Sequence, residues 1–130
     1  KGTNVAPGQN FTCNTSGPVT ARISGFKQIP KNEKTMALYV ATYGPILVGL
    51  NAMPFETYIG GVMSATSCGT GPVDSAMAIV GYNMEAETPY WILKNSWSTS
   101  WGEEGYAFLE FGKNACDIDE MAFTAFAAKI

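Results

Sequence analysis

The chain has 130 residues, the usual length of one domain, and 46% of its residues are hydrophobic whereas 15% are charged. This composition is typical of a globular protein with a core and argues against a disordered chain. The formal net charge is −3 and no run of lysine or arginine occurs, so we expect no nucleic-acid partner. No apolar stretch approaches the roughly 20 residues of a membrane-spanning helix, so we expect no membrane partner.

The first thirty residues are rich in turn-forming pairs, which include Pro7-Gly8 and Gly17-Pro18. A short alternating stretch from Val19 to Phe26 predicts an edge strand. This part of the chain is typical of a lead-in from an earlier segment.

The next element is a helix from Asn32 to Tyr43. Apolar side chains recur there at helical spacing, at Met36, Tyr39, Val40 and Tyr43. The pair Gly44-Pro45 then ends the helix. We expect the helix to pack against a sheet through Met36, Val40 and Tyr43.

Four short runs of β-branched or aromatic residues follow the helix, and each is bounded by Gly, Pro or Asn. They predict strands at 45–50, 76–82, 90–94 and 106–111. Strands of this kind with one helix indicate an α+β domain with an antiparallel sheet. We find neither an internal repeat nor a linker that would divide the chain.

The chain has three cysteines and no histidine. An odd number of cysteines in a secreted protein indicates that one of them pairs with another chain or with a further segment. Two sequons begin at Asn10 and Asn14, on either side of Cys13, and are candidate glycosylation sites. The lack of histidine removes the commonest general base and the commonest metal ligand, so we expect no metal site and no cofactor.

A family resemblance rests on two segments near the C-terminus. The segment from Pro89 to Trp97 reads PYWILKNSW, and the segment from Trp101 to Tyr106 reads WGEEGY. Together they resemble the asparagine region of papain-like cysteine proteinases. The segments Tyr58–Val62 and Ala76–Asn83 are similar to the strands on either side of the histidine in that family.

The sequence at 60–63 and 80–83 is most similar to the protozoan, cathepsin-L-like branch of the family. The likeness runs from about Phe11 to the C-terminus. It implies that residues 1–130 are the C-terminal half of a papain-like proteinase domain, the right-hand domain with its barrel-like antiparallel sheet. The N-terminal helical half is then missing from this chain and is an expected partner.

The main departure from the family lies at Ser75. Members read Asp-His-Ala or Asp-His-Gly just before the strand, whereas this chain reads Val73-Asp74-Ser75-Ala76. The nucleophilic cysteine and the glutamine of the oxyanion hole belong to the half that this chain does not contain. A serine hydroxyl is too weak a base to take a thiol proton, and it carries no charge that would stabilise a thiolate. We therefore expect a catalytically inactive homologue.

The resemblance also assigns roles to Asn95, Trp97 and Trp101. In the family, the asparagine orients the histidine ring, and the first tryptophan shields that hydrogen bond from water. Without a ring to orient, Asn95 is expected to satisfy a turn or to bond Ser75 or nearby backbone. Aromatic residues at this density are also typical of a core, so both interpretations of the tryptophans stay open.

Three apolar positions correspond to the family's pocket for the second residue before the scissile bond: Gly49, Val73 and Met121. The carbonyl of Asp74 would face the peptide backbone. An equal alternative is that these residues pack against the missing half. Cys68 and Cys116 match the family's disulfide within this domain, whereas Cys13 matches a cysteine whose partner lies in the other half.

Three functions follow from these observations. The first is a non-catalytic homologue that binds peptides, prodomain-like inhibitors or another protein in the old cleft. The alternative is an active cysteine endopeptidase that is completed by a separate N-terminal half. The third is a structural or antigenic secreted protein with a filled cleft, which exposed apolar residues near Gly49 and Met121 would count against. We expect a secreted or lysosomal/endosomal location.

Overall fold

The computed structural model describes residues 12–129. Within these residues the chain forms one α-helix, α1 (Glu33–Tyr43), three short 3₁₀ helices and seven strands. The strands are β1 (Arg22–Ile29), β2 (Ile46–Leu50), β3 (Val62–Met63), β4 (Ser75–Asn83), β5 (Tyr90–Lys94), β6 (Tyr106–Glu110) and β7 (Met121–Ala128). The 3₁₀ helices span Met53–Thr57, Ala65–Ser67 and Ala115–Asp117.

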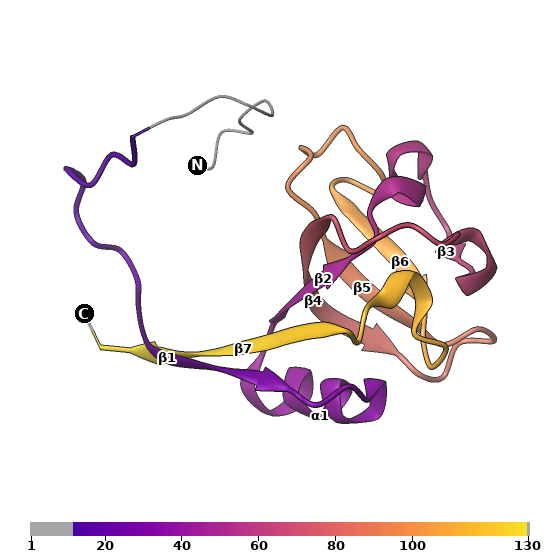
Figure 1. Cartoon of the computed structure of the whole chain (residues 1–130), viewed down its shortest axis with the longest axis horizontal. Coiled ribbons are helices and arrows are strands. Elements are labelled where there is room, and N and C mark those ends of the chain that lie inside the picture. Colours follow the sequence, from indigo (N-terminus) through magenta and orange to yellow (C-terminus); the bar gives the residue numbers. More distant parts are fainter. Residues whose placement is uncertain (1–11, 130) are drawn as a thin grey trace.

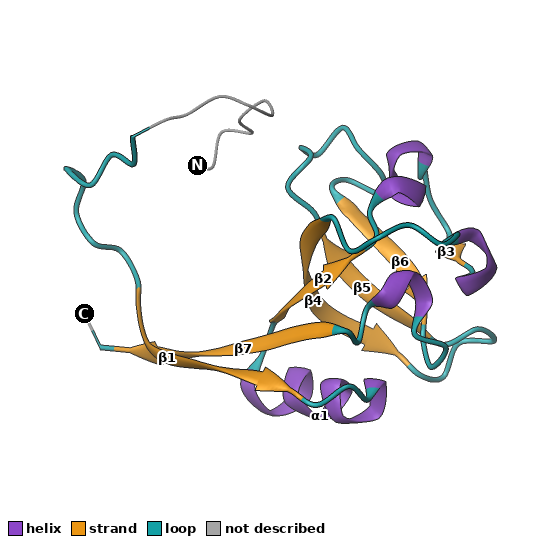
Figure 2. Ribbon diagram, in the orientation of Figure 1, coloured by secondary structure: helices purple, strands orange, loops and turns teal. Residues whose placement is uncertain are grey.

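The strands form one sheet in the order β1-β7-β2-β4-β5-β6-β3, which is antiparallel except where β3 pairs with β6 (Figures 1 and 2). The predicted α+β class is confirmed, and so are the four predicted strands, with shifts of one residue at some ends. The first strand lies at 22–29 instead of 19–26. The sequence did not indicate β7, because a run rich in alanine has a low intrinsic preference for strands.

Helix α1 packs on one side of the sheet, as predicted (Figure 1). Asn32 is its N-cap, since its Oδ1 accepts a hydrogen bond of 2.9 Å from the Thr35 N–H. Met36 and Val40 are buried, which confirms the face that they mark. Tyr43 has the spacing of that face but is not buried with the other two residues, since it is 59% exposed. It lies in the last turn of α1, where its ring packs edge to face against Phe126 of β7 and at a tilt against Tyr39.

The two faces of the sheet differ because side chains alternate along each strand. The face toward α1 carries the largest fully buried core side chains, which include Ile46, Val48, Leu50, Met77, Ile79, Trp91 and Leu93. The other face of β1, β7 and β2 carries apolar side chains that stay accessible in the described part of the chain. Phe26 is 70% exposed and Leu47 is 53% exposed. We call this surface the open face and define it by Ile23, Phe26, Leu47, Phe123 and Ala125.

Candidate functional site

Three strand segments enclose an apolar groove at the end of β2. Its volume is about 470 Å³, and its lining residues are Leu47, Val48, Gly49, Val73, Asp74, Ser75, Ala76, Met121 and Phe123. We call it the Gly49 groove. Gly49 pairs with Ala76 of β4 on one side and with Met121 of β7 on the other. The structure thus brings together Gly49, Val73 and Met121, although 72 residues separate the first from the last.

Gly49 keeps the floor of this groove open. A Cβ atom at this position would lie 3.0 Å from Val73 Cγ1 and 3.2 Å from Met121 Cβ, closer than ordinary van der Waals contact. The Met121 side chain is 46% exposed, so it forms a wall that a ligand can reach. The groove can therefore accept an apolar side chain, and no larger residue than glycine fits at its floor without movement.

Asp74 and Ser75 stand at the rim of the Gly49 groove. The Asp74 N–H donates to the Leu50 carbonyl at 3.2 Å, and its Oδ1 accepts from the Ala52 N–H at 2.8 Å. The carboxylate is thus turned back onto the backbone that follows β2. Ser75 is half-buried at the first position of β4, opposite Leu50. Its hydroxyl makes no hydrogen bond with any described residue.

Asn95 follows the last residue of β5. Its Oδ1 accepts a hydrogen bond of 2.8 Å from the Ser96 N–H, so it bonds nearby backbone and not Ser75. Its Nδ2 is buried and has no partner among the described residues. Ala78 pairs with Lys94, so the next pair in register would join Met77 and Asn95. Met77 lies two residues after Ser75 on β4, so Asn95 and Ser75 lie on the same face of the sheet.

The structure does not bring Trp97 and Trp101 into the Gly49 groove. Their rings meet edge to face with centroids 5.2 Å apart, and both pack against the core. The Trp101 Nε1–H also donates to the Phe55 carbonyl at 2.9 Å. This arrangement agrees with the interpretation of the two tryptophans as core residues. Both follow Asn95 in the chain.

A disulfide joins Cys68 and Cys116, the pair that the family resemblance implies. Both cysteines are 4% exposed. Cys13 is exposed and unpaired among the described residues. Asn14 is exposed too, and its Oδ1 accepts from the backbone N–H of Ser16 at 3.0 Å. The other candidate glycosylation site, Asn10, lies outside the described residues.

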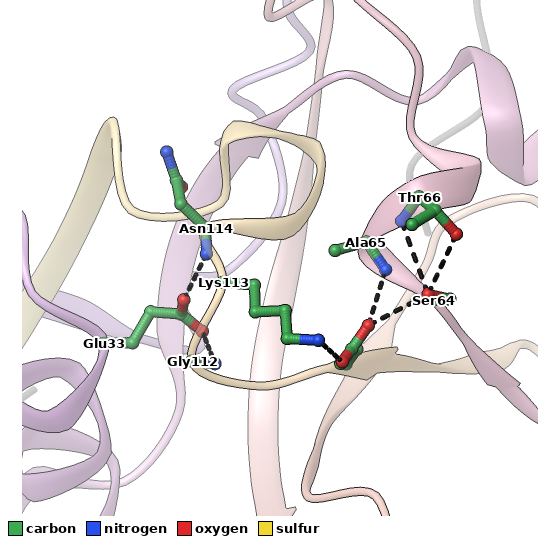
Figure 3. A network of polar contacts seen from close by, with 8 residues as sticks. Glu33, Ser64, Ala65, Thr66, Gly112, Lys113 and Asn114 are labelled. Atoms are coloured by element: carbon green, nitrogen blue, oxygen red, sulfur yellow. Dashed lines mark hydrogen bonds and ion pairs between the residues drawn. The ribbon is translucent and has the colours of Figure 1, made fainter.

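Two buried carboxylates escaped the sequence analysis because nothing in the local pattern separates them from surface glutamates. Glu33 is 7% exposed and accepts a hydrogen bond of 2.7 Å from the Trp91 indole. It also accepts hydrogen bonds from the backbone N–H groups of Gly112 and Asn114 (Figure 3). It thereby ties the start of α1 to the core and to the turn after β6. Its role is structural, remote from the Gly49 groove.

Glu110, at the end of β6, is 8% exposed. Its carboxylate binds Lys113 Nζ at 2.8 Å and accepts hydrogen bonds from the Ala65 N–H and the Ser64 hydroxyl. The Lys113 contact, followed by the bonds from Ala65 and Ser64, lowers the pKa of Glu110 to about 2. Figure 3 shows Lys113, Ser64 and Ala65 converging on this carboxylate. The network fixes the 64–67 turn on β6.

The described residues contain no helix that is long and apolar enough to cross a membrane. They also contain no group of three or more cysteine, aspartate or glutamate side chains that could hold a metal ion.

Comparison with known proteins gives a consistent result. The family model described as papain family cysteine protease matches residues 4–126. Cysteine proteinase 1 of Dictyostelium discoideum is 40% identical over 119 residues, which cover 87% of this chain and 34% of that protein. Cysteine proteinase A of Leishmania mexicana is 42% identical over 113 residues, which cover 87% of this chain and 31% of that protein.

Two solved structures are similar to this chain in both fold and sequence. The digestive procathepsin L2 proteinase from the larval midgut of Tenebrio molitor superimposes with a TM-score of 0.75 at 38% identity, over 83% of this chain and 35% of that one. Procathepsin L 3 from the same tissue gives a TM-score of 0.73 at 32% identity. The match covers the C-terminal part of their fold, and the chain spans about a third of the length of the relatives that it matches.

Proposed function

Because this chain belongs to the papain family of cysteine proteases, we propose that it is the C-terminal half of a papain-like domain that binds peptides without cleaving them. The observation that carries the proposal is the Gly49 groove, which is open and apolar and has a serine at its rim. The bound segment would insert an apolar side chain between Val73 and Met121. The Asp74 carbonyl would bind its backbone.

The lack of cleavage follows from Ser75, which we assign to the position of the family's catalytic histidine. The assignment is supported by its place directly after Asp74 and at the start of β4, the strand that contains Val80-Gly81-Tyr82. An imidazole lowers the pKa of a cysteine nucleophile and later protonates the leaving amine, and a hydroxyl does neither at neutral or acidic pH. Loss of a positioned acid–base costs about 10²–10⁴ in rate.

The N-terminal half of the fold is the proposed partner of the open face. A second apolar groove of about 440 Å³ runs along this face, between Phe26 of β1, Phe123 of β7 and Leu47 of β2. A surface with this many accessible apolar side chains is typical of an interface. Cys13 would form its disulfide with the same partner.

The compartment follows from the sulfur chemistry. The disulfide between Cys68 and Cys116 favours an oxidising route, and the exposed sequon at Asn14 is compatible with glycosylation there. We propose a secreted or lysosomal/endosomal location.

The test is an assay of the complete protein with a fluorogenic peptide and a thiol-directed, peptide-like inhibitor, at acidic and neutral pH. We expect turnover below about 1/100 of that of an active relative. If the other half carries a cysteine nucleophile, Ser75→His should restore both labelling and turnover. Robust turnover with stoichiometric labelling of the unaltered protein would refute the proposal and establish the alternative, an active cysteine endopeptidase.

A further inference from the structure

Asn51 is a buried amide that binds the backbone of both disulfide-linked cysteines. It is 1% exposed and directly follows β2. Its Nδ2 donates to the Cys68 carbonyl at 3.0 Å, and its backbone N–H donates to the Cys116 carbonyl at 2.9 Å. Its Oδ1 accepts from the Met53 N–H at 3.2 Å. The side chain thus donates to the backbone of Cys68 and accepts from that of Met53, while the backbone of the same residue bonds Cys116.

The segment from Cys68 to Asp74 is attached to the end of β2 at both of its ends. Cys68 is held by the Asn51 amide, and Asp74 is held by the backbone of Leu50 and Ala52. Between these points the chain passes directly over the amide. A Cβ atom on Gly71 would lie 2.6 Å from Asn51 Nδ2, a distance that real Cβ atoms do not show.

This attachment reaches two walls of the Gly49 groove. Val73 belongs to the attached segment and lies beside Gly49. Met121 begins β7 five residues after Cys116, whose carbonyl the Asn51 backbone binds, and it also pairs with Gly49. Gly49 itself lies two residues before Asn51. One residue therefore connects the floor of the groove to both of its walls, through its side-chain amide on the Val73 side and through its backbone N–H on the Met121 side.

We propose that Asn51 is a positioning residue that sets the distance between Val73 and Met121 and thereby the size of the apolar side chain that the groove accepts. The inference rests on the proposed function for the identity of the ligand. Its geometric part does not depend on any ligand. The amide is required because it must donate at one end to Cys68 and accept at the other from Met53.

Asn51→Asp separates these roles. An aspartate has the same shape and still accepts from Met53, but it cannot donate to the Cys68 carbonyl, which would face a second acceptor. Loss of one partner of a buried hydrogen bond leaves the other group unsatisfied, so the 68–74 segment should move. Gly71→Ala displaces the same segment by contact while Asn51 remains intact. Glu33→Gln is the control, since it weakens another buried network, whose contacts at Trp91, Gly112 and Asn114 do not line the groove.

The experiment uses the complete protein with ¹³C-labelled methyl groups on valine and methionine. Its probe is a fluorescein-labelled peptide with one leucine among glycines. We expect Asn51→Asp and Gly71→Ala to shift the methyl resonances of Val73 and Met121 and to weaken binding of the probe about tenfold. Glu33→Gln should change neither quantity.

The outcomes separate the two proposals. Unchanged Val73 and Met121 resonances in folded Asn51→Asp and Gly71→Ala proteins would overturn the positioning role, whatever happens to binding. Equal shifts in Glu33→Gln would overturn it too, because the effect would then be general destabilisation. If the methyl groups respond as expected but the unaltered protein does not bind the probe, the positioning role stands and the peptide-binding function fails.

Discussion

Gly49→Ala tests whether the Gly49 groove is a binding site for an apolar side chain. The added methyl would lie 3.0 Å from Val73 Cγ1 and 3.2 Å from Met121 Cβ, so these walls must give by a few tenths of an ångström. Overpacking of this kind costs about 1–3 kcal/mol. Replacement of glycine by alanine in a strand returns about 0.5–1 kcal/mol. The free energy of unfolding should therefore fall by at most about 2.5 kcal/mol.

The effect on binding should exceed the effect on stability. Full burial of a leucine side chain is worth about 1.5–3 kcal/mol, and the methyl occupies the floor on which it would rest. We expect the complete Gly49→Ala protein to bind a leucine-containing probe at least about tenfold more weakly. Its affinity for the same probe with alanine in place of leucine should change little, so the preference for leucine disappears.

Fluorescence polarisation with the two probes measures this preference, and chemical denaturation measures stability in parallel. Gly25→Ala is the matched control, because Gly25 also lies in a strand but a Cβ atom there meets nothing within 4 Å. An unchanged preference for leucine in Gly49→Ala would show that the groove is not the binding site. A loss of preference in Gly25→Ala would refute the geometric argument.

Three further predictions concern stability. The contacts of Glu110 lower its pKa to about 2. Its contribution to the free energy of unfolding is therefore fully present above its ordinary pKa of 4.5 and is lost as the pH falls toward 2. Glu110→Gln should make the urea midpoint less dependent on pH over that range. Burial, and next the nearby Glu33 carboxylate, raise the pKa of Asp119 above its ordinary 3.8. Its contribution to the free energy of unfolding is therefore fully present below pH 3.8 and is lost as the pH rises through the raised pKa. Asp119→Asn should remove this loss of stability, which thermal unfolding across pH 3–7 would measure. Reduction of the disulfide between Cys68 and Cys116 should lower the free energy of unfolding by about 4 kcal/mol in the loop-entropy model. Urea titrations that find the same stability with and without reductant would contradict this prediction.

Local features could be predicted from the sequence because they depend on neighbours in the chain. The periodicity of Met36 and Val40 predicts a helix and its buried face from the local sequence alone. The runs at 90–94 and 106–111 are strands for similar reasons. The family was recognisable from the sequence around Asn95 and Trp101, and the proposed departure at Ser75 rests on the same resemblance.

Features that depend on pairing over long separations were decided by the tertiary structure. β7 is poor in strand formers and becomes a strand because β1 and β2 bond it on both edges, and that insertion alone brings Met121 to Gly49. Tyr43 has the correct helical spacing, but it lies in the last turn of α1, where its ring contacts Tyr39 and Phe126 and it stays 59% exposed. The role of Asn51 is likewise invisible in the sequence, because its partners at Cys68 and Cys116 become neighbours only when the sheet and the disulfide have formed. Sequence spacing reports which face of an element is apolar, whereas the contacts that a polar side chain satisfies depend on which distant segments the fold brings to it.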